Sequence, residues 1–206
     1  MQHATLAAWQ GHWCELGAVS DDALHARLIT AWSEPQRHYH TLQHLDECLA
    51  HFDTAREAAQ RPGEVALALW FHDAIYDTQR HDNEARSAAL AHDSLLQAGV
   101  ARDAADRVHA LVMATRHDAL PQGADAQLLV DIDLAILGAP RERFDEYERQ
   151  VGLEYAHVPE ADRRAGRGRI LRAFLARPAI YGTPLFRARF EAAARANLAY
   201  SLGKLG

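Results

Sequence analysis

Two chemically active side chains stand directly behind the most apolar stretch of the sequence. Residues 65–71 read VALALWF, and His72 and Asp73 follow at once, within the segment WFHDAIYD. Moving an ionised carboxylate into a protein interior is costly unless the group is paired or binds a metal ion. The His–Asp pair is therefore either a salt-bridged structural element or part of a metal site.

Two further segments carry groups of the same kind. In RHYHTLQH, His40 and His44 are four residues apart, so on a helix they would project from one face and could share a metal ion, or serve an ion and its substrate. In LLVDIDLAILG, Asp131 and Asp133 are the two acids of an otherwise apolar stretch, so each needs a partner. A helix cap or an ion pair would account for either acid. Metal ligation accounts better for them once the other ligands exist, because zinc, manganese, iron and cobalt accept mixed imidazole and carboxylate ligands.

The order of these motifs resembles the HD superfamily of metal-dependent phosphohydrolases. More closely, the chain resembles a bacterial subgroup of predicted HD phosphohydrolases, over about residues 35 to 200. The shared features are RHYH with a later His, WFHD.IYD, NE..SA at residues 83–88, DIDLAILG, an Ile-Tyr pair at residues 180–181 and AR.NL at residues 194–198. The combination is specific, whereas any one of these motifs alone is not.

The resemblance implies roles for individual residues. The metal ligands would be His44, His72, Asp73 and Asp133, and His40 would be the general acid that protonates the leaving group. The roles of His40 and His44 could also be exchanged, because His40 too begins a pattern that other HD proteins use for the first ligand. Asp131 is the alternative to Asp133.

Further residues are weaker candidates for the same site. Asp77, one helical turn after Asp73 if the helix continues, would hold a water or a second ion, and Glu84 would reach the site from the next helix. His117, in TRHD, lies where several HD subfamilies place a ligand for a second metal. Arginines could orient a substrate phosphate through paired hydrogen bonds, and the sequence does not choose among them. They are Arg37, Arg116, Arg167 and Arg169.

The implied activity is hydrolysis of a phosphoester or phosphoanhydride bond in a small phosphate ester or a nucleotide by metal-activated water. The cofactor would be one or two divalent ions per chain, with manganese, iron, cobalt, nickel, zinc and magnesium all open. Two other readings remain. One is an HD-type di-iron oxygenase, for which His117 with His81 or His109 would supply the additional ligands. The other is a non-catalytic regulator that binds a metal or a nucleotide.

The sequence predicts an all-α fold, a helical bundle of the HD-domain type with about eight to ten helices. Apolar periodicity, caps and breakers favour helices starting near residues 20, 39, 64, 83, 101, 126, 140, 159 and 183, and no stretch alternates as a strand would. We expect one domain over residues 1–206, with the core motifs in 38–137 and the helices of 140–203 packed on or covering it.

Composition narrows the expected partners. The net charge of −6 argues against binding to extended nucleic acid. No apolar run approaches the roughly 18 residues that span a membrane, and the N-terminus lacks the pattern of a secretory signal. With only two cysteines and no such signal, we expect reduced thiols in a cytoplasmic protein. The expected partner is a small phosphorylated molecule, and the oligomeric state is open, a homodimer included.

Overall fold

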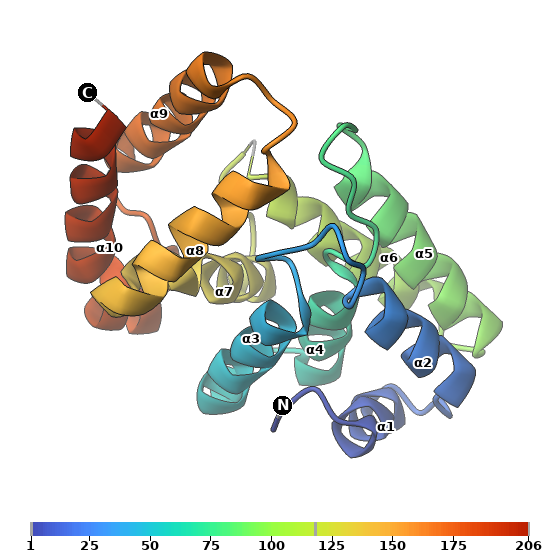
Figure 1. Cartoon of the computed structure of the whole chain (residues 1–206). Coiled ribbons are helices and arrows are strands. Elements are labelled where there is room, and N and C mark those ends of the chain that lie inside the picture. Colours follow the sequence, from blue (N-terminus) through green and yellow to red (C-terminus); the bar gives the residue numbers. More distant parts are fainter. Residues whose placement is uncertain (1, 118, 206) are drawn as a thin grey trace. The chain divides into compact units, whose positions relative to one another are not determined.

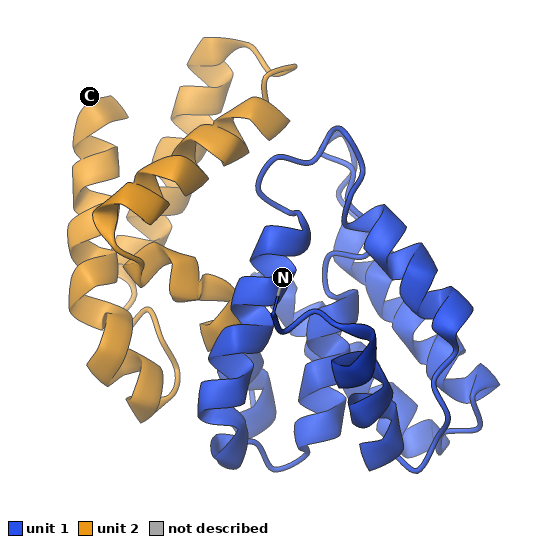
Figure 2. Ribbon diagram, turned by 60° about the horizontal axis from the view of Figure 1, so that its bottom comes forward, with its two compact units in different colours: residues 1–130 blue, residues 131–206 orange. Residues whose placement is uncertain are grey.

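The computed structural model describes residues 2–117 and 119–205. Within these residues it contains ten α-helices, three short 3-10 helices and no strand, which confirms the all-α prediction. The chain forms two compact units, residues 1–130 and residues 131–206 (Figure 2). The single domain expected over residues 1–206 stays a prediction.

The first unit contains the helices α1 to α6 and most of α7 (Figure 1). Short 3-10 helices, η1 and η2, follow α3 and α6. The bounds are α1 (Leu6–Glu15), α2 (Asp22–Ala31), α3 (Leu42–Ala55), η1 (Arg56–Ala58), α4 (Pro62–Phe71), α5 (Asn83–Gln97), α6 (Arg102–Met113), η2 (Ala114–Arg116) and α7 (Ala124–Asp133).

Helix α4 is the core of this unit. All residues from Val65 to Phe71 are fully buried, and the helix packs against α1, α3, α5 and α6. A helix that is apolar on every side is stable only when other elements surround it. The motif that follows α4 is therefore attached to a helix that is buried in the core of the unit.

Helix α1 was not predicted, and its packing on α4 explains why it forms. Trp9 is fully buried, and its ring meets the Trp70 ring edge to face at 5.3 Å. The two helices approach closely at Gly63, where an added Cβ would lie 2.6 Å from Leu16 Cδ1 and 2.9 Å from Glu15 Cβ. The N-cap is Thr5, whose hydroxyl accepts a hydrogen bond from Ala8 N. Tertiary packing, rather than a clear amphipathic pattern, stabilises this helix.

His12 on α1 gives the first unit a predicted pH dependence. The residue is buried and its ring packs edge-on against Phe52. Burial lowers the pKa of His12 below its ordinary value of 6.5, so the unfolded chain takes up a proton at a pH where the folded chain does not. We expect the free energy of unfolding to fall as the pH drops below about 6.5, by up to about 1.4 kcal/mol per pH unit for this proton.

Urea unfolding at about pH 7.5 and about pH 5.5 measures this effect against a His12→Phe variant. Phenylalanine keeps an aromatic ring against Phe52 and removes the titrating group, so the variant should lose less stability on acidification than the wild type. Equal losses in the two proteins would show that His12 does not contribute.

The second unit contains the end of α7, the 3-10 helix η3 (Leu134–Gly138), α8 (Arg141–Glu154), α9 (Glu160–Ala176) and α10 (Pro184–Leu205). Two side chains hold η3 in place. The Tyr181 hydroxyl donates to Leu134 O at 3.1 Å, and Asn197 Nδ2 donates to Leu137 O and Ala139 O, both at 2.9 Å. The Ile-Tyr and AR.NL motifs near the end of the sequence therefore have a structural role.

Among the described residues, no helix combines the length and the apolar composition needed to cross a lipid bilayer.

Candidate metal centre

His72 and Asp73 lie where α4 ends. His72 is the C-cap residue, 1 % exposed, and its Nδ1 lies 2.7 Å from Leu69 O. A carbonyl oxygen only accepts, so Nδ1 is the donor in this contact, and Nε2 is the ring nitrogen left to bind a metal ion. Asp73 follows in the turn, where its Oδ2 lies 3.3 Å from His72 Nε2. The end of the helix thus lets two adjacent side chains converge.

His40 and His44 of RHYHTLQH do not share a helix, and this corrects the expectation that they project from one helical face. Thr41 is the N-cap of α3, and its hydroxyl accepts from Gln43 N at 3.3 Å. His44 is therefore in the first turn of α3, whereas His40 lies in the turn before it. Their rings are nevertheless only 5.9 Å apart, because the turn at the N-cap brings His40 back over the start of the helix.

Three donor atoms in the first unit have the spacing that a metal ion requires. His44 Nε2 lies 3.2 Å from His72 Nε2 and 4.0 Å from Asp73 Oδ2, and the third side of this triangle is the 3.3 Å contact between His72 and Asp73. A point equidistant from the three atoms lies about 2.1 Å from each, which is the length of a zinc–nitrogen or zinc–oxygen bond. The donor set and its spacing therefore fit a divalent transition metal.

His40 lies at the exposed edge of this group. Its Nε2 is 3.9 Å from Asp73 Oδ2, and its side chain is 21 % exposed, against 2 % for His44. The His40 ring stacks on the Tyr76 ring with 4.1 Å between the ring centres. Because His40 is open to solvent, it could exchange a proton with a bound molecule.

Two neighbours of His44 were not assigned any role from the sequence. Tyr39 is buried, and its hydroxyl lies 3.0 Å from His44 Nδ1, on the side of the ring away from His72. Cys48, one turn further along α3, places its sulfur 3.7 Å from both ring nitrogens of His44. One ligand atom each of His44, Cys48 and His72 lie within 4.8 Å of one another. The only available signal was the four-residue spacing from His44 to Cys48.

Arg37 does not face the site as a phosphate ligand would, which disfavours its expected role. Its side chain is fully buried. Nη1 donates to Asp73 O at 2.6 Å and to His40 O at 3.2 Å, Nη2 donates to Ala74 O at 3.1 Å, and Nε donates to Glu34 at 3.0 Å. Arg37 thus joins the backbone beside His40 to the backbone of the His-Asp motif.

Asp77 and Glu84 lie on the segment that leads away from the metal motif. The helix ends at Phe71, so Asp77 is not one helical turn beyond Asp73. Asp77 is exposed, and its carboxylate accepts from Gln79 N at 2.9 Å. Glu84 is half-buried in the first turn of α5. The catalytic roles expected for both residues stay predictions, although the turn contact of Asp77 gives that residue a structural use.

The NE..SA motif fastens this segment to α5. Asn83 exchanges two hydrogen bonds with the backbone of Asp77, at 2.8 and 3.2 Å. Ser87 accepts from Ile75 N at 3.0 Å and donates to Ile75 O at 3.3 Å. The motif therefore serves to hold the residues that follow His72 and Asp73.

His117 and Arg116 lie at the end of η2. Arg116 is its last residue, and His117 follows with φ of 57°, the left-handed conformation that non-glycine residues rarely adopt. Such strained positions occur often at functional sites. Their roles in binding a second metal and a substrate phosphate stay predictions.

The two acids of DIDLAILG have different surroundings. Asp131 is buried, and its carboxylate accepts from Gly182 N at 2.6 Å, Thr183 N at 2.7 Å and Thr183 Oγ1 at 2.6 Å. Burial raises the pKa of Asp131, and these hydrogen bonds oppose that effect. Since both oxygens fix the segment before α10, Asp133 is the better ligand candidate. Asp133 ends α7 within the second unit, and its role as a ligand stays a prediction.

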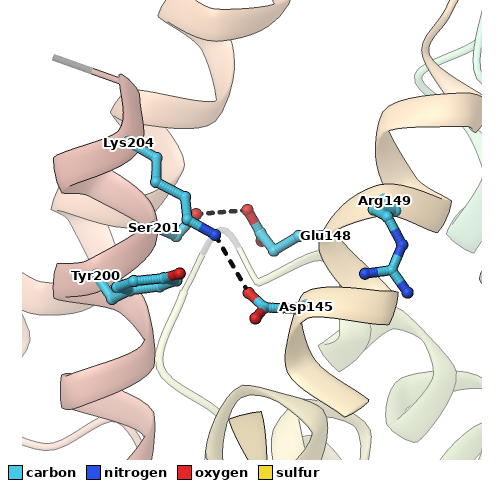
Figure 3. Close-up of a pocket in the computed structure, with 6 residues that line it drawn as sticks. All are labelled: Asp145, Glu148, Arg149, Tyr200, Ser201 and Lys204. Carbon is cyan, nitrogen blue, oxygen red and sulfur yellow. Dashed lines mark hydrogen bonds and ion pairs between the residues drawn. The ribbon is translucent and has the colours of Figure 1, made fainter. Parts of the chain in front are cut away.

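The second unit has a cavity of its own, of about 340 Å³, between α8 and α10 (Figure 3). Its polar groups pair with one another: Lys204 Nζ lies 3.5 Å from Asp145 Oδ1, and the Ser201 hydroxyl donates to Glu148. Arg167, a sequence candidate for phosphate binding, also donates to Glu148 and to the Tyr147 hydroxyl. Because these groups form hydrogen bonds and ion pairs with one another, the cavity is a weaker candidate for a functional site than the histidine cluster. Arg169 is exposed on α9.

Comparison with known proteins identifies no relative: no protein-family model, no curated protein and no solved structure matches this chain.

Proposed function

We propose that this protein is a metal-dependent phosphohydrolase of the HD type, which cleaves a phosphoester or phosphoanhydride bond in a small phosphate ester or nucleotide. The observation that carries the proposal is the triangle formed by His44 Nε2, His72 Nε2 and Asp73 Oδ2, with sides of 3.2, 3.3 and 4.0 Å. The motif order found in the sequence supports the same reading. Asp133 would complete the ligand set, and one or two divalent ions would bind.

A bound divalent ion supplies Lewis-acid polarisation of a phosphoryl oxygen and acidifies water, so that a nucleophile exists at neutral pH. The side chains of this cluster would orient that chemistry. Asp73 would supply a carboxylate oxygen beside the two buried imidazoles, and the hydrogen bond to Leu69 O orients the His72 ring so that its Nε2 would be available to bind the ion.

His40 would provide the proton for the leaving group. Its Nε2 lies 3.9 Å from Asp73 Oδ2, and its side chain is 21 % exposed, which would give a substrate access to the ring. An imidazolium at this position can donate its Nε2 proton to the leaving oxygen. Tyr76, stacked on the other side, holds the ring in place. Arg116 remains the candidate of the first unit for contact with a substrate phosphate.

The test is metal-dependent hydrolysis by the purified chain. Protein stripped with chelator would be reloaded separately with manganese, iron, cobalt, nickel, zinc or magnesium. Each form would be assayed for phosphate release from aryl phosphate mono- and diesters and from nucleoside mono-, di- and triphosphates. We expect hydrolysis only with metal present, and a His72→Ala variant should neither retain the ion nor hydrolyse the substrates.

Elemental analysis of the same preparations separates the alternatives. One or two transition-metal ions per wild-type chain, lost in His72→Ala, support the proposal when hydrolysis accompanies them. Two irons per chain without hydrolysis would instead favour the di-iron oxygenase reading. A chain that binds no metal, even on reloading, would contradict the proposed function.

A further inference from the structure

Cys48 places a sulfur atom beside the imidazole nitrogens of the candidate metal centre. The residue is 2 % exposed and lies on α3 one turn after His44, so the two side chains project from the same face of the helix. Its sulfur is 3.7 Å from His44 Nε2, the same nitrogen that lies 3.2 Å from His72 Nε2. The thiol therefore borders the position where the imidazole nitrogens converge.

This spacing is the one expected between two ligands of a single ion. Zinc–sulfur bonds are about 2.3 Å and zinc–nitrogen bonds about 2.0–2.1 Å, so sulfur and nitrogen ligands at a tetrahedral angle are about 3.6 Å apart. The observed 3.7 Å between Cys48 Sγ and His44 Nε2 agrees with this value. One ligand atom each of Cys48, His44 and His72 also lie within 4.8 Å of one another, so the three side chains form one cluster.

We infer that Cys48 is a sulfur ligand of the ion held by His44 and His72, and that the site prefers a borderline-soft ion such as zinc, cobalt or ferrous iron over manganese or magnesium. The inference rests on the metal site of the proposed function, but not on hydrolysis. When the ion binds, the S–H bond breaks, a sulfur–metal bond forms and the proton passes to solvent, with no change in oxidation state.

The preference follows from the chemistry of the donor. Thiolate ligands favour zinc and other softer ions, whereas magnesium and manganese favour carboxylate, carbonyl and water oxygens. A site made only of imidazole and carboxylate ligands would discriminate less between zinc and manganese. Of the six metals that the sequence left open, a Cys48 ligand therefore favours zinc, cobalt and iron and disfavours manganese and magnesium.

Cobalt is the probe, because a thiolate bound to Co²⁺ gives an intense near-ultraviolet charge-transfer absorption, while imidazole and carboxylate ligands give only weaker visible bands. Metal-free wild-type protein, Cys48→Ser, Cys48→Ala and Cys14→Ser would each be titrated with Co²⁺. Cys14 is the matched control, since it is the only other cysteine and is exposed on α1. Circular dichroism checks that each variant is folded.

We expect the charge-transfer band in the wild type and in Cys14→Ser, and its loss in both Cys48 variants while the visible bands persist. The ratio of zinc affinity to manganese affinity should also be at least about tenfold lower in Cys48→Ser than in the wild type. If the Cys48 variants do not fold, Cys14→Ser still decides, because Cys48 is then the only thiol.

Three outcomes overturn the inference. Visible cobalt bands without charge transfer in the wild type would show a metal site without sulfur, and would leave the proposed function intact. Loss of the charge-transfer band in Cys14→Ser would show that Cys14, and not Cys48, supplies the sulfur ligand. A wild-type chain that binds no cobalt would refute this inference and the metal site of the proposed function together.

Discussion

His44→Ala should lose the bound metal ion, whereas His40→Ala should keep the ion and lose turnover by about 10²- to 10⁴-fold, the usual contribution of a general acid. The expectation follows from where each imidazole lies. His44 is almost fully buried, and its Nε2 forms one corner of the donor triangle with His72 and Asp73. His40 lies outside that triangle and is more exposed, with its Nε2 3.9 Å from Asp73 Oδ2.

Elemental analysis after gel filtration and steady-state kinetics on the same samples measure the two effects. His38→Ala is the matched control, because His38 is exposed and lies in the same segment just before His40. The control should retain both metal and activity. If His40→Ala instead loses the ion while His44→Ala keeps it, the two roles are exchanged, which is the alternative that the sequence left open.

The dependence of kcat on pH in the wild type and in His40→Ala tests the role of His40 independently. If His40 donates a proton, the fall of kcat at high pH in the wild type reports the loss of that proton, and this limb should be absent from the residual activity of His40→Ala. A structural role for His40 would lower activity at every pH alike. The profile therefore separates a proton donor from a residue that only packs against Tyr76.

Most helices could be predicted from local signals in the sequence. Gly99, with φ of 81°, lies just beyond the end of α5, and Pro140 and Pro159 directly precede α8 and α9, near the predicted starts of these helices. Helix α1 was missed because its stability depends on Trp9 and Trp13 packing against α4, which no local pattern records. The helix predicted from about residue 39 begins at Leu42, because Thr41 is its N-cap.

The sequence indicated that His72 and Asp73 need partners, because they follow an apolar run, and the resemblance to the HD superfamily implied that His44 joins them. The remaining groups of the site could not be predicted. The sequence shows that Arg37 carries donors, but only the fold shows that backbone carbonyls use them. Likewise Cys48 reads as an ordinary buried thiol until the helix places it beside His44.

Removing the Arg37 guanidinium should destabilise the first unit and disorder the metal centre at the same time. Its nitrogens donate to three backbone carbonyls, those of His40, Asp73 and Ala74, and Asp73 is 36 residues away in sequence. Hydrogen bonds from a charged donor contribute about 1.5–3 kcal/mol each, and buried carbonyls left without a donor add a further cost. We expect Arg37→Ala to lower the free energy of unfolding by about 3 kcal/mol or more, as measured by urea denaturation of the metal-free protein.

Arg37→Lys distinguishes positioning from charge. Lysine keeps the positive charge but is a compact donor that cannot match the planar fork of the guanidinium, so it should recover only part of the stability. Because the carbonyls that Arg37 holds belong to His40 and Asp73, the lysine variant should also bind cobalt more weakly than the wild type even where it is fully folded. Arg27→Ala, on the exposed face of α2, is the control and should change neither quantity. Wild-type stability and cobalt affinity in Arg37→Ala would show that the backbone around the metal motif holds its shape without this side chain.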